Sequence, residues 1–254
     1  MKKVQKGAEP KLLESYRIGN PGNSWSQYRR NTDRRDQIYD QLRSDQGGLC
    51  AYCEIDLKPK NASEAADFRV EHFHPKSDIS TSHNWHLDWQ NLLACCHGDS
   101  RPDVVDAGSR FANPHSCDVP KGENDWDNLI FNPLHLPAYP CLFQFNRSDG
   151  SISVNVANCN NADVDITKAQ ATIDNLNLDG VRLRNLRKPV LNQLNLQLRI
   201  LVESGYTVDD ARNRLAQAAL KKDNNTHWPA FFSAIRDYLG AAAEKQLAAI
   251  NYNG

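Results

Sequence analysis

Five of the seven cysteines fall within one stretch of the sequence, and this clustering constrains the fold more than any other feature. Cys50 and Cys53 form a C-x-x-C pair, Cys95 and Cys96 are adjacent, and Cys117 follows about twenty residues later. The start of the chain lacks the apolar core of a secretory signal, so we expect a cytoplasmic protein in which structural disulfides are rare. The clustered cysteines therefore favour a metal site.

The composition is that of a soluble globular protein, with 40% hydrophobic and 24% charged residues in 254. No apolar run approaches the ~20 residues that cross a bilayer, so no membrane association is expected. The formal net charge of -1 provides no overall attraction for a polyanion. Two basic clusters are candidate phosphate contacts or solvated helix faces: Arg29, Arg30, Arg34 and Arg35, and Arg182, Arg184, Arg187 and Lys188.

Hydrophobic periodicity and turn residues predict an α+β fold. An amphipathic helix is expected over residues 25–43, ended by Gly47-Gly48. The expected strands are 68–73 and 92–95, with a β-hairpin formed by 142–145 and 151–154 and an inserted surface loop at 98–116. Beyond about residue 165 the pattern is helical, with further helices at 208–222 and 228–250, and Pro189 is expected to kink or divide its leucine-rich run.

Three short motifs follow the first cysteine pair. They are Glu71-His72 with Pro75 and Ser77, Asn91 before an apolar strand, and Cys117-Asp118-x-x-Lys121-Gly122. In this order and spacing they resemble the HNH nuclease motif, and the flanking cysteines resemble the zinc-stapled branch of that family. The resemblance covers residues 49–122. It implies a zinc-stapled ββα-metal (HNH) core, to which we add a mainly helical C-terminal lobe.

The resemblance also implies roles for the residues of this core. His72 is the expected general base, since a pKa near neutrality suits the removal of a proton from water. Glu71 and Asp118 are expected to bind Mg²⁺ through hard oxygen atoms. Asn91 is expected to hold the loop or orient the His72 ring, and Lys121 is a candidate phosphate contact.

The resemblance further predicts a structural Zn²⁺ held by Cys50, Cys53, Cys96 and Cys117. Cys95 is the alternative to Cys96, because only one of two adjacent strand residues points toward the site. Two features depart from the family pattern. Asp118 stands where Asn or His is usual, which retains a good Mg²⁺ ligand. The gap before Cys117 is longer than usual, which leaves open which of His97, Asp99 and Cys117 completes each site.

A narrower resemblance extends beyond this core. Lys6-Gly7-x-Glu9-Pro10, the segment 47–54 and Asn132-Pro133-Leu134 are similar to the Septu-type, PtuB-like HNH nucleases, a group with members encoded with retrons. That family acts in anti-phage defence beside an ABC-type ATPase. The resemblance implies a PtuA-like ATPase as partner, with a retron reverse transcriptase and its DNA–RNA product as further partners. Because the sequence has no G-x-x-x-x-G-K-[ST] motif, nucleotide hydrolysis must come from another chain.

These patterns divide the chain into three parts. Residues 1–48 form an N-terminal segment that is a candidate partner-binding region, 49–135 form the HNH core, and 136–254 form a β-hairpin with a helical lobe. The predicted function is that of a nuclease effector. The family resemblance favours DNA as substrate, although metal-activated water can equally cut a structured RNA such as tRNA. The alternative function is a zinc-knuckle scaffold without cleavage activity.

Overall fold

A computed structural model of the chain describes residues 1–58, 67–100 and 115–254, so most of the expected insertion at 98–116 lies outside the described residues. The helices are α1 (Lys11–Gly19), α2 (Trp25–Tyr28), α3 (Thr32–Asp45), α4 (Asp118–Lys121), α5 (Val156–Asn161), α6 (Ile166–Asn175), α7 (Val181–Glu203), α8 (Val208–Ala219), α9 (Phe232–Leu239) and α10 (Ala241–Ala249). The strands are β1 (Arg69–His72), β2 (Leu92–Cys95), β3 (Phe143–Phe145) and β4 (Ile152–Val154). Two short 3-10 turns are η1 (Trp89–Asn91) and η2 (Pro133–His135).

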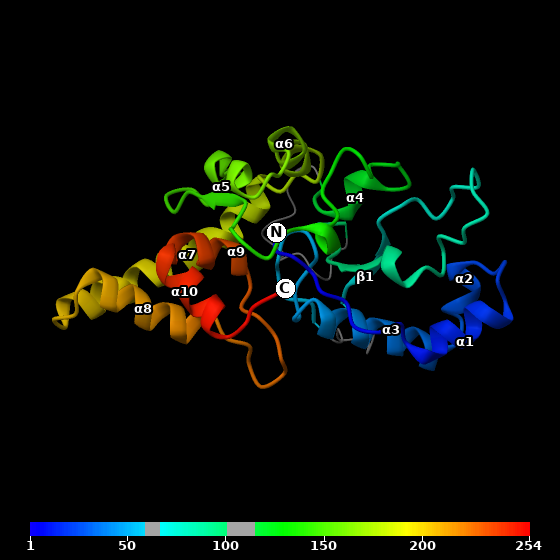
Figure 1. The fold of residues 1–254 in the computed structure, drawn as a ribbon, viewed down its shortest axis with the longest axis horizontal. Helices are drawn as coiled ribbons and strands as arrows, with labels where there is room; N and C mark the ends of the chain where they lie inside the picture. The colour runs from blue at the N-terminus through cyan, green and yellow to red at the C-terminus, as the bar shows by residue number, and fades with distance from the viewer. Residues whose placement is uncertain (59–66, 101–114) are drawn as a thin grey trace.

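These elements make an elongated, mostly helical α+β molecule (Figure 1). The helices α1 and α2 lie at one end, α7 to α10 lie at the other, and α3, β1 and α4 lie between them. The two termini lie close together near the middle, where Lys3 Nζ donates to Asn253 Oδ1 at 3.0 Å. In the described part of the chain, no helix has both the length and the apolar character needed to span a membrane.

The central unit is a small antiparallel sheet followed by a short helix. β1 pairs with β2 so that Glu71 faces Leu93 and His72 faces Leu92, which confirms both predicted strands. The outer edge of β2 is covered by a side chain: Gln46 accepts from the Ala94 N–H at 2.7 Å and donates to the Ala94 carbonyl at 2.8 Å. Both backbone groups of this buried strand residue are therefore satisfied without a third strand. The sheet and α4 give the predicted ββα order along the chain.

The predicted helix at 25–43 is two helices, because the sequence supplies a second N-cap. Ser24 and Gln27 form a capping box at the start of α2. Asn31 then caps α3 by accepting from the Arg34 N–H at 2.9 Å. At the end of α3, Gly47 and Gly48 adopt φ values of 64° and 78°, which glycine adopts without strain. This confirms the predicted stop at Gly47-Gly48.

The N-terminal segment crosses the start of β2 through Lys6, a residue of the Septu-like pattern. Its Nζ donates to the Leu92 carbonyl at 2.7 Å and to the Trp89 carbonyl, and lies 3.6 Å from the centre of the Trp89 ring. Burial lowers the pKa of Lys6 to about 7. Lys6 therefore fixes the backbone on both sides of Asn91.

The C-terminal part contains a second hydrophobic core, which α7, α8, α9 and α10 share. α7 continues unbroken through Pro189, so of the two expectations for this proline, a kink or a division of the helical run, the division was wrong. Leu183, Leu191 and Leu194 are buried on α7 on both sides of the proline, and this burial offsets the lost backbone hydrogen bond. The predicted helix at 228–250 is divided instead at Gly240, whose φ is 57°. The predicted β-hairpin is confirmed as β3 and β4.

Candidate metal and catalytic site

The structure gathers four of the five clustered cysteines: Cys50, Cys53, Cys96 and Cys117. The Sγ–Sγ distances are 3.9 Å between Cys50 and Cys117, 3.7 Å between Cys53 and Cys96, and 3.5 Å between Cys96 and Cys117. Four thiolates bound to Zn²⁺ at about 2.3 Å would stand about 3.8 Å apart at the corners of a tetrahedron. The spacing and the soft donor set therefore fit a structural zinc ion.

Local backbone geometry brings these thiols together from three places in the chain. Cys50 and Cys53 lie in the turn after Leu49, which forms an isolated bridge with Asp56. Cys96 directly follows β2, and Cys117 stands with φ 64° at the start of α4. The backbone N–H of Cys96 donates to Cys50 Sγ at 3.4 Å, which favours a thiolate there. The long gap before Cys117 therefore does not prevent it from completing the cluster.

The adjacent cysteine and histidine lie outside this cluster. Cys95 is fully buried on β2, opposite Arg69, so Cys96 is the member of the pair that joins the four thiols. His97 is also buried, and its Nε2 lies 3.7 Å from Asp67 Oδ1. His97 is thus not one of the four clustered donors.

Two buried carboxylates lie on the ββα unit, one at the end of β1 and one at the start of α4. Glu71 is 8% exposed and Asp118 is 4% exposed. Burial raises the pKa of Glu71 to about 7, and the negative charge of Asp118 adds to this effect. Burial likewise raises the pKa of Asp118 to about 6, against the opposing effect of the Arg69 guanidinium. Asp118 Oδ1 is buried and has no hydrogen-bond partner among residues 1–58, 67–100 and 115–254, as expected of an oxygen that a cation would satisfy. This pair fits a hard divalent ion such as Mg²⁺.

The raised pKa values predict that Mg²⁺ binding at this pair depends on pH. Below pH 7 the ion must displace a proton from Glu71, and below pH 6 from Asp118 as well. We expect the Mg²⁺ affinity to fall at least about tenfold per pH unit as the pH drops below these values. Isothermal titration calorimetry across this range measures the effect. Glu71→Gln is the control, which should lose the dependence near pH 7, and an affinity that is constant with pH would contradict the prediction.

Each carboxylate already pairs with a cation of the chain. Lys121 Nζ lies 3.0 Å from Glu71 Oε1 and donates to the His72 carbonyl at 3.1 Å, while Arg69 pairs with Asp118. Lys121 is fully buried, so in this structure its ammonium group is not exposed to a substrate phosphate. Its ammonium group instead joins α4 to the end of β1, where it holds the backbone of His72 in place.

His72 is buried beneath the N-terminal segment. Its ring packs edge-on against Trp25 with centroids 5.5 Å apart, and its Nε2 lies 3.2 Å from the His86 carbonyl. Burial lowers the pKa of His72 to about 3, so the expectation of a pKa near neutrality was wrong. A carbonyl oxygen only accepts hydrogen bonds, so the proton of the neutral ring is on Nε2 and the lone pair is on Nδ1. The buried ring is thus neutral throughout the physiological range, and the same burial weakens its affinity for a proton.

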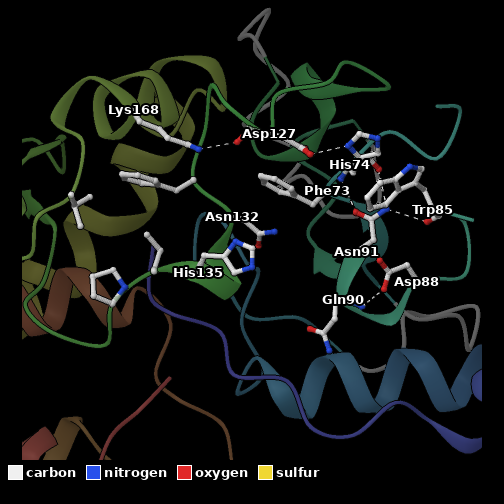
Figure 2. A pocket seen from close by; sticks show the side chains of 14 residues that line it. Phe73, His74, Trp85, Asp88, Gln90, Asn91, Asp127, Asn132, His135 and Lys168 are labelled. Atoms are coloured by element: carbon white, nitrogen blue, oxygen red, sulfur yellow. Dashed lines mark hydrogen bonds and ion pairs between the residues drawn. The ribbon is translucent and has the colours of Figure 1, made fainter. Parts of the chain in front are cut away.

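Asn91 holds the loop that follows β1. Its Oδ1 accepts from the His74 N–H at 2.6 Å, and its Nδ2 donates to the carbonyls of His74 and Trp85 at 3.0 Å each (Figure 2). Of the two expectations for Asn91, the structure shows the loop contact. The His72 ring is positioned by Trp25 and the His86 carbonyl instead.

Sequence reasoning missed one polar residue of this region, His74, to which the motifs assign no role. The His74 ring lies between two carboxylates, with Nδ1 2.8 Å from Asp127 Oδ2 and Nε2 2.9 Å from Asp78 Oδ2. Burial alone would lower the pKa of His74, but the two carboxylates outweigh it and the pKa is raised. Two features of the sequence could have indicated its role. One is a histidine inside the motif that runs from Glu71 to Ser77, and the other is the Asp125-x-Asp127 pair.

The fold and the site together define the class of protein. A β-hairpin followed by a short helix carries an acid–histidine pair and a second carboxylate, and four cysteines lie beside it. This is the arrangement of a ββα-metal, or HNH, protein with a four-cysteine cluster that could hold zinc. No family model matches the chain. Over 218 residues the chain is 34% identical to the Escherichia coli protein named "Retron Ec83 putative HNH endonuclease", covering 77% of this chain and 81% of the relative. The chain belongs to the HNH endonuclease family.

Proposed function

We propose that the chain is a Mg²⁺-dependent endonuclease that hydrolyses phosphodiester bonds as the nuclease subunit of a retron-associated anti-phage complex. The observation that supports the chemistry best is that one ββα unit carries His72 and two buried carboxylates. Glu71 directly precedes His72 on β1, and Asp118 follows it at the start of α4. Asp118 Oδ1 has no hydrogen-bond partner in the part of the chain that the structure describes. These residues combine a neutral base with a binding site for a divalent cation.

The roles of the residues in the proposed reaction follow from their contacts. Glu71 and Asp118 would hold the cation, which when bound supplies positive charge to the scissile phosphate and to the leaving oxygen. His72 Nδ1 would accept the proton of the attacking water, while the His86 carbonyl keeps the other ring proton on Nε2. Asn91 would keep the following loop in place through its three hydrogen bonds to backbone. Because His72 is 5% exposed, substrate access requires the covering segment around Trp25 to move.

The proposed partners rest on the relative and on charge. The name of the E. coli relative associates that protein with a retron. With a net charge of -1, this chain attracts nucleic acid weakly by itself, which favours a complex in which another subunit contributes to binding. The chain lacks a P-loop motif. We therefore propose an ABC-type, PtuA-like ATPase as partner, with a retron reverse transcriptase and its DNA–RNA product in the same assembly.

The substrate class and the activity are tested together in one assay. The purified chain, alone and with the ATPase encoded beside it, is incubated with plasmid DNA and with total tRNA, in Mg²⁺ or in EDTA. We expect Mg²⁺-dependent cleavage by the complex, with DNA as the favoured substrate and tRNA as the alternative. The absence of cleavage by both preparations would favour the scaffold function, for which the four cysteines alone are sufficient.

A further inference from the structure

A second cluster of metal-binding groups lies outside the carboxylate pair of Glu71 and Asp118. It consists of His74, Asp125 and Asp127, whose donor atoms all lie within 4.8 Å of one another. Oxygen and nitrogen ligands at about 2.1 Å from one cation lie about 3–4 Å apart, so only a small adjustment is needed to close this cluster on an ion. We propose that these three residues form a second divalent-cation site, separate from the catalytic carboxylates and from the four cysteines.

The orientation of His74 supports a metal ligand. Its Nε2 is 2.9 Å from Asp78 Oδ2, while its Nδ1 faces Asp127. Histidines that bind metals commonly donate their other ring N–H to a carboxylate, which fixes the tautomer and the ring plane. Asp78 is in the position to do this. The ion would displace the proton that Nδ1 otherwise donates to Asp127, so that Nδ1 and Asp127 both become ligands. Asn91 fixes the backbone N–H and carbonyl of His74, so the ligand is held at its main chain as well.

The opposite side of the cluster is also held in place. The Asp127 carbonyl accepts from Lys168 Nζ at 2.8 Å, and the Asp127 N–H donates to Asp125 Oδ1 at 3.0 Å. The second carboxylate oxygen of Asp127, Oδ1, is buried and has no hydrogen-bond partner within the described ranges. A buried acceptor without a donor is unfavourable, and a cation at this point would satisfy it.

A cavity next to the cluster gives an ion a route in and room for water. The cavity has a volume of about 430 Å³, and His74, Trp85, Asp127 and Lys168 are among the residues that line it. Figure 2 shows His74 and Asp127 facing each other at its wall, with Trp85 beside His74. The centroids of the Trp85 and His74 rings are 4.0 Å apart, so the indole covers one side of the cluster. Water from the cavity could complete the coordination that three protein ligands leave open.

The donor set indicates which ion the site takes. One imidazole nitrogen with two carboxylates suits Mn²⁺ and the later first-row ions better than Mg²⁺, which prefers oxygen ligands. Such an ion would join residues 125–127 to the loop after β1. It would do so through His74, which is two residues beyond His72. The inference does not depend on the proposed reaction, because it concerns metal binding alone.

Mn²⁺ binding to the full chain tests this site, with bound and free ion distinguished by electron paramagnetic resonance. The wild-type protein should bind one Mn²⁺ at the Glu71 pair and one at the His74 cluster. Asp125→Asn/Asp127→Asn should lose one ion, Glu71→Gln should lose the other, and Asp174→Asn, at an exposed acid on α6, should lose neither. The inference is overturned if the double variant binds as many ions as the wild type. If only Glu71→Gln binds as many Mn²⁺ ions as the wild type, the proposed catalytic site at Glu71 is wrong. The proposed site at His74 is then still supported.

A milder variant keeps the test decisive if the double variant does not fold. Asp78→Asn leaves all three proposed ligands in place and removes only the carboxylate that orients the ring. We expect it to weaken Mn²⁺ binding at this site by about 10–100-fold, as for other outer-sphere partners of metal-bound histidines. An unchanged affinity in Asp78→Asn would show that the Asp78–His74–Asp127 contact is only an ion pair and would overturn the proposal.

Discussion

Replacing His72 with alanine is expected to lower the rate of nucleic-acid cleavage by about 10²–10⁴-fold, the usual contribution of a general base. The ring is neutral because burial lowers its pKa to about 3, and the His86 carbonyl leaves Nδ1 free to accept a proton. Alanine removes this acceptor without touching the carboxylates or the cysteines. The initial rate of cleavage by the active assembly, at saturating Mg²⁺, measures the loss.

The matched control is His83→Ala. The His83 side chain is half exposed and pairs with Asp88 at 3.0 Å, so its removal deletes a histidine of the same region that has no role in the proposed reaction. It should retain the wild-type rate. Because His72 contacts Trp25, the zinc content and the circular dichroism spectrum of His72→Ala should be compared with the wild type. A folded His72→Ala protein with undiminished cleavage would exclude His72 as the base.

The second large effect is expected from Cys117→Ser, which should abolish zinc binding and unfold much of the ββα core. Structural zinc contributes about 10–16 kcal/mol of apparent binding free energy in zinc-finger peptides, comparable with the whole stability of a domain. Cys117 links the start of α4 to thiols from two other parts of the chain, so its loss also separates Asp118 from β1. Zinc content by mass spectrometry and the melting temperature measure the effect.

Cys95→Ala provides the comparison for this prediction. Cys95 is as deeply buried as Cys96 and next to it in sequence, but it lies outside the four-thiol cluster. The variant should retain one zinc ion per chain and lose only the packing of a small side chain, about 1–2 kcal/mol. The zinc assignment would be wrong if Cys117→Ser kept its zinc, or if Cys95→Ala lost it.

The parts of the fold that sequence predicted correctly depend on local signals. Alternating apolar residues predicted β1 and the β3–β4 hairpin, a short continuous apolar run predicted β2, and Gly47-Gly48 marked the end of α3. Pro189 misled the prediction because a proline is a local signal, whereas α7 is held by buried leucines packed against helices far along the chain. The N-cap Asn31 was a local signal too, and it could have divided the predicted helix at 25–43.

The site was predictable only where residue type and spacing determine it. The resemblance to the HNH motif grouped Cys50 and Cys53 with two later cysteines, and it placed Glu71 and Asp118 on one unit. The burial of His72 under Trp25 was not predictable, because it depends on how residues far from the motif pack over it. The same is true of Lys121, a surface-type residue that tertiary packing buries against Glu71.

A Mg²⁺ titration of the cleavage rate tests the central claim most directly, with wild-type protein and Glu71→Gln compared in the active assembly. Glutamine preserves the shape of the side chain but removes the charge that the proposed cation requires. The account predicts that wild-type cleavage depends on Mg²⁺ and saturates, and that Glu71→Gln needs at least about tenfold more Mg²⁺ or is inactive. Two superimposable titration curves would contradict it, because the catalytic ion would then not be held by Glu71.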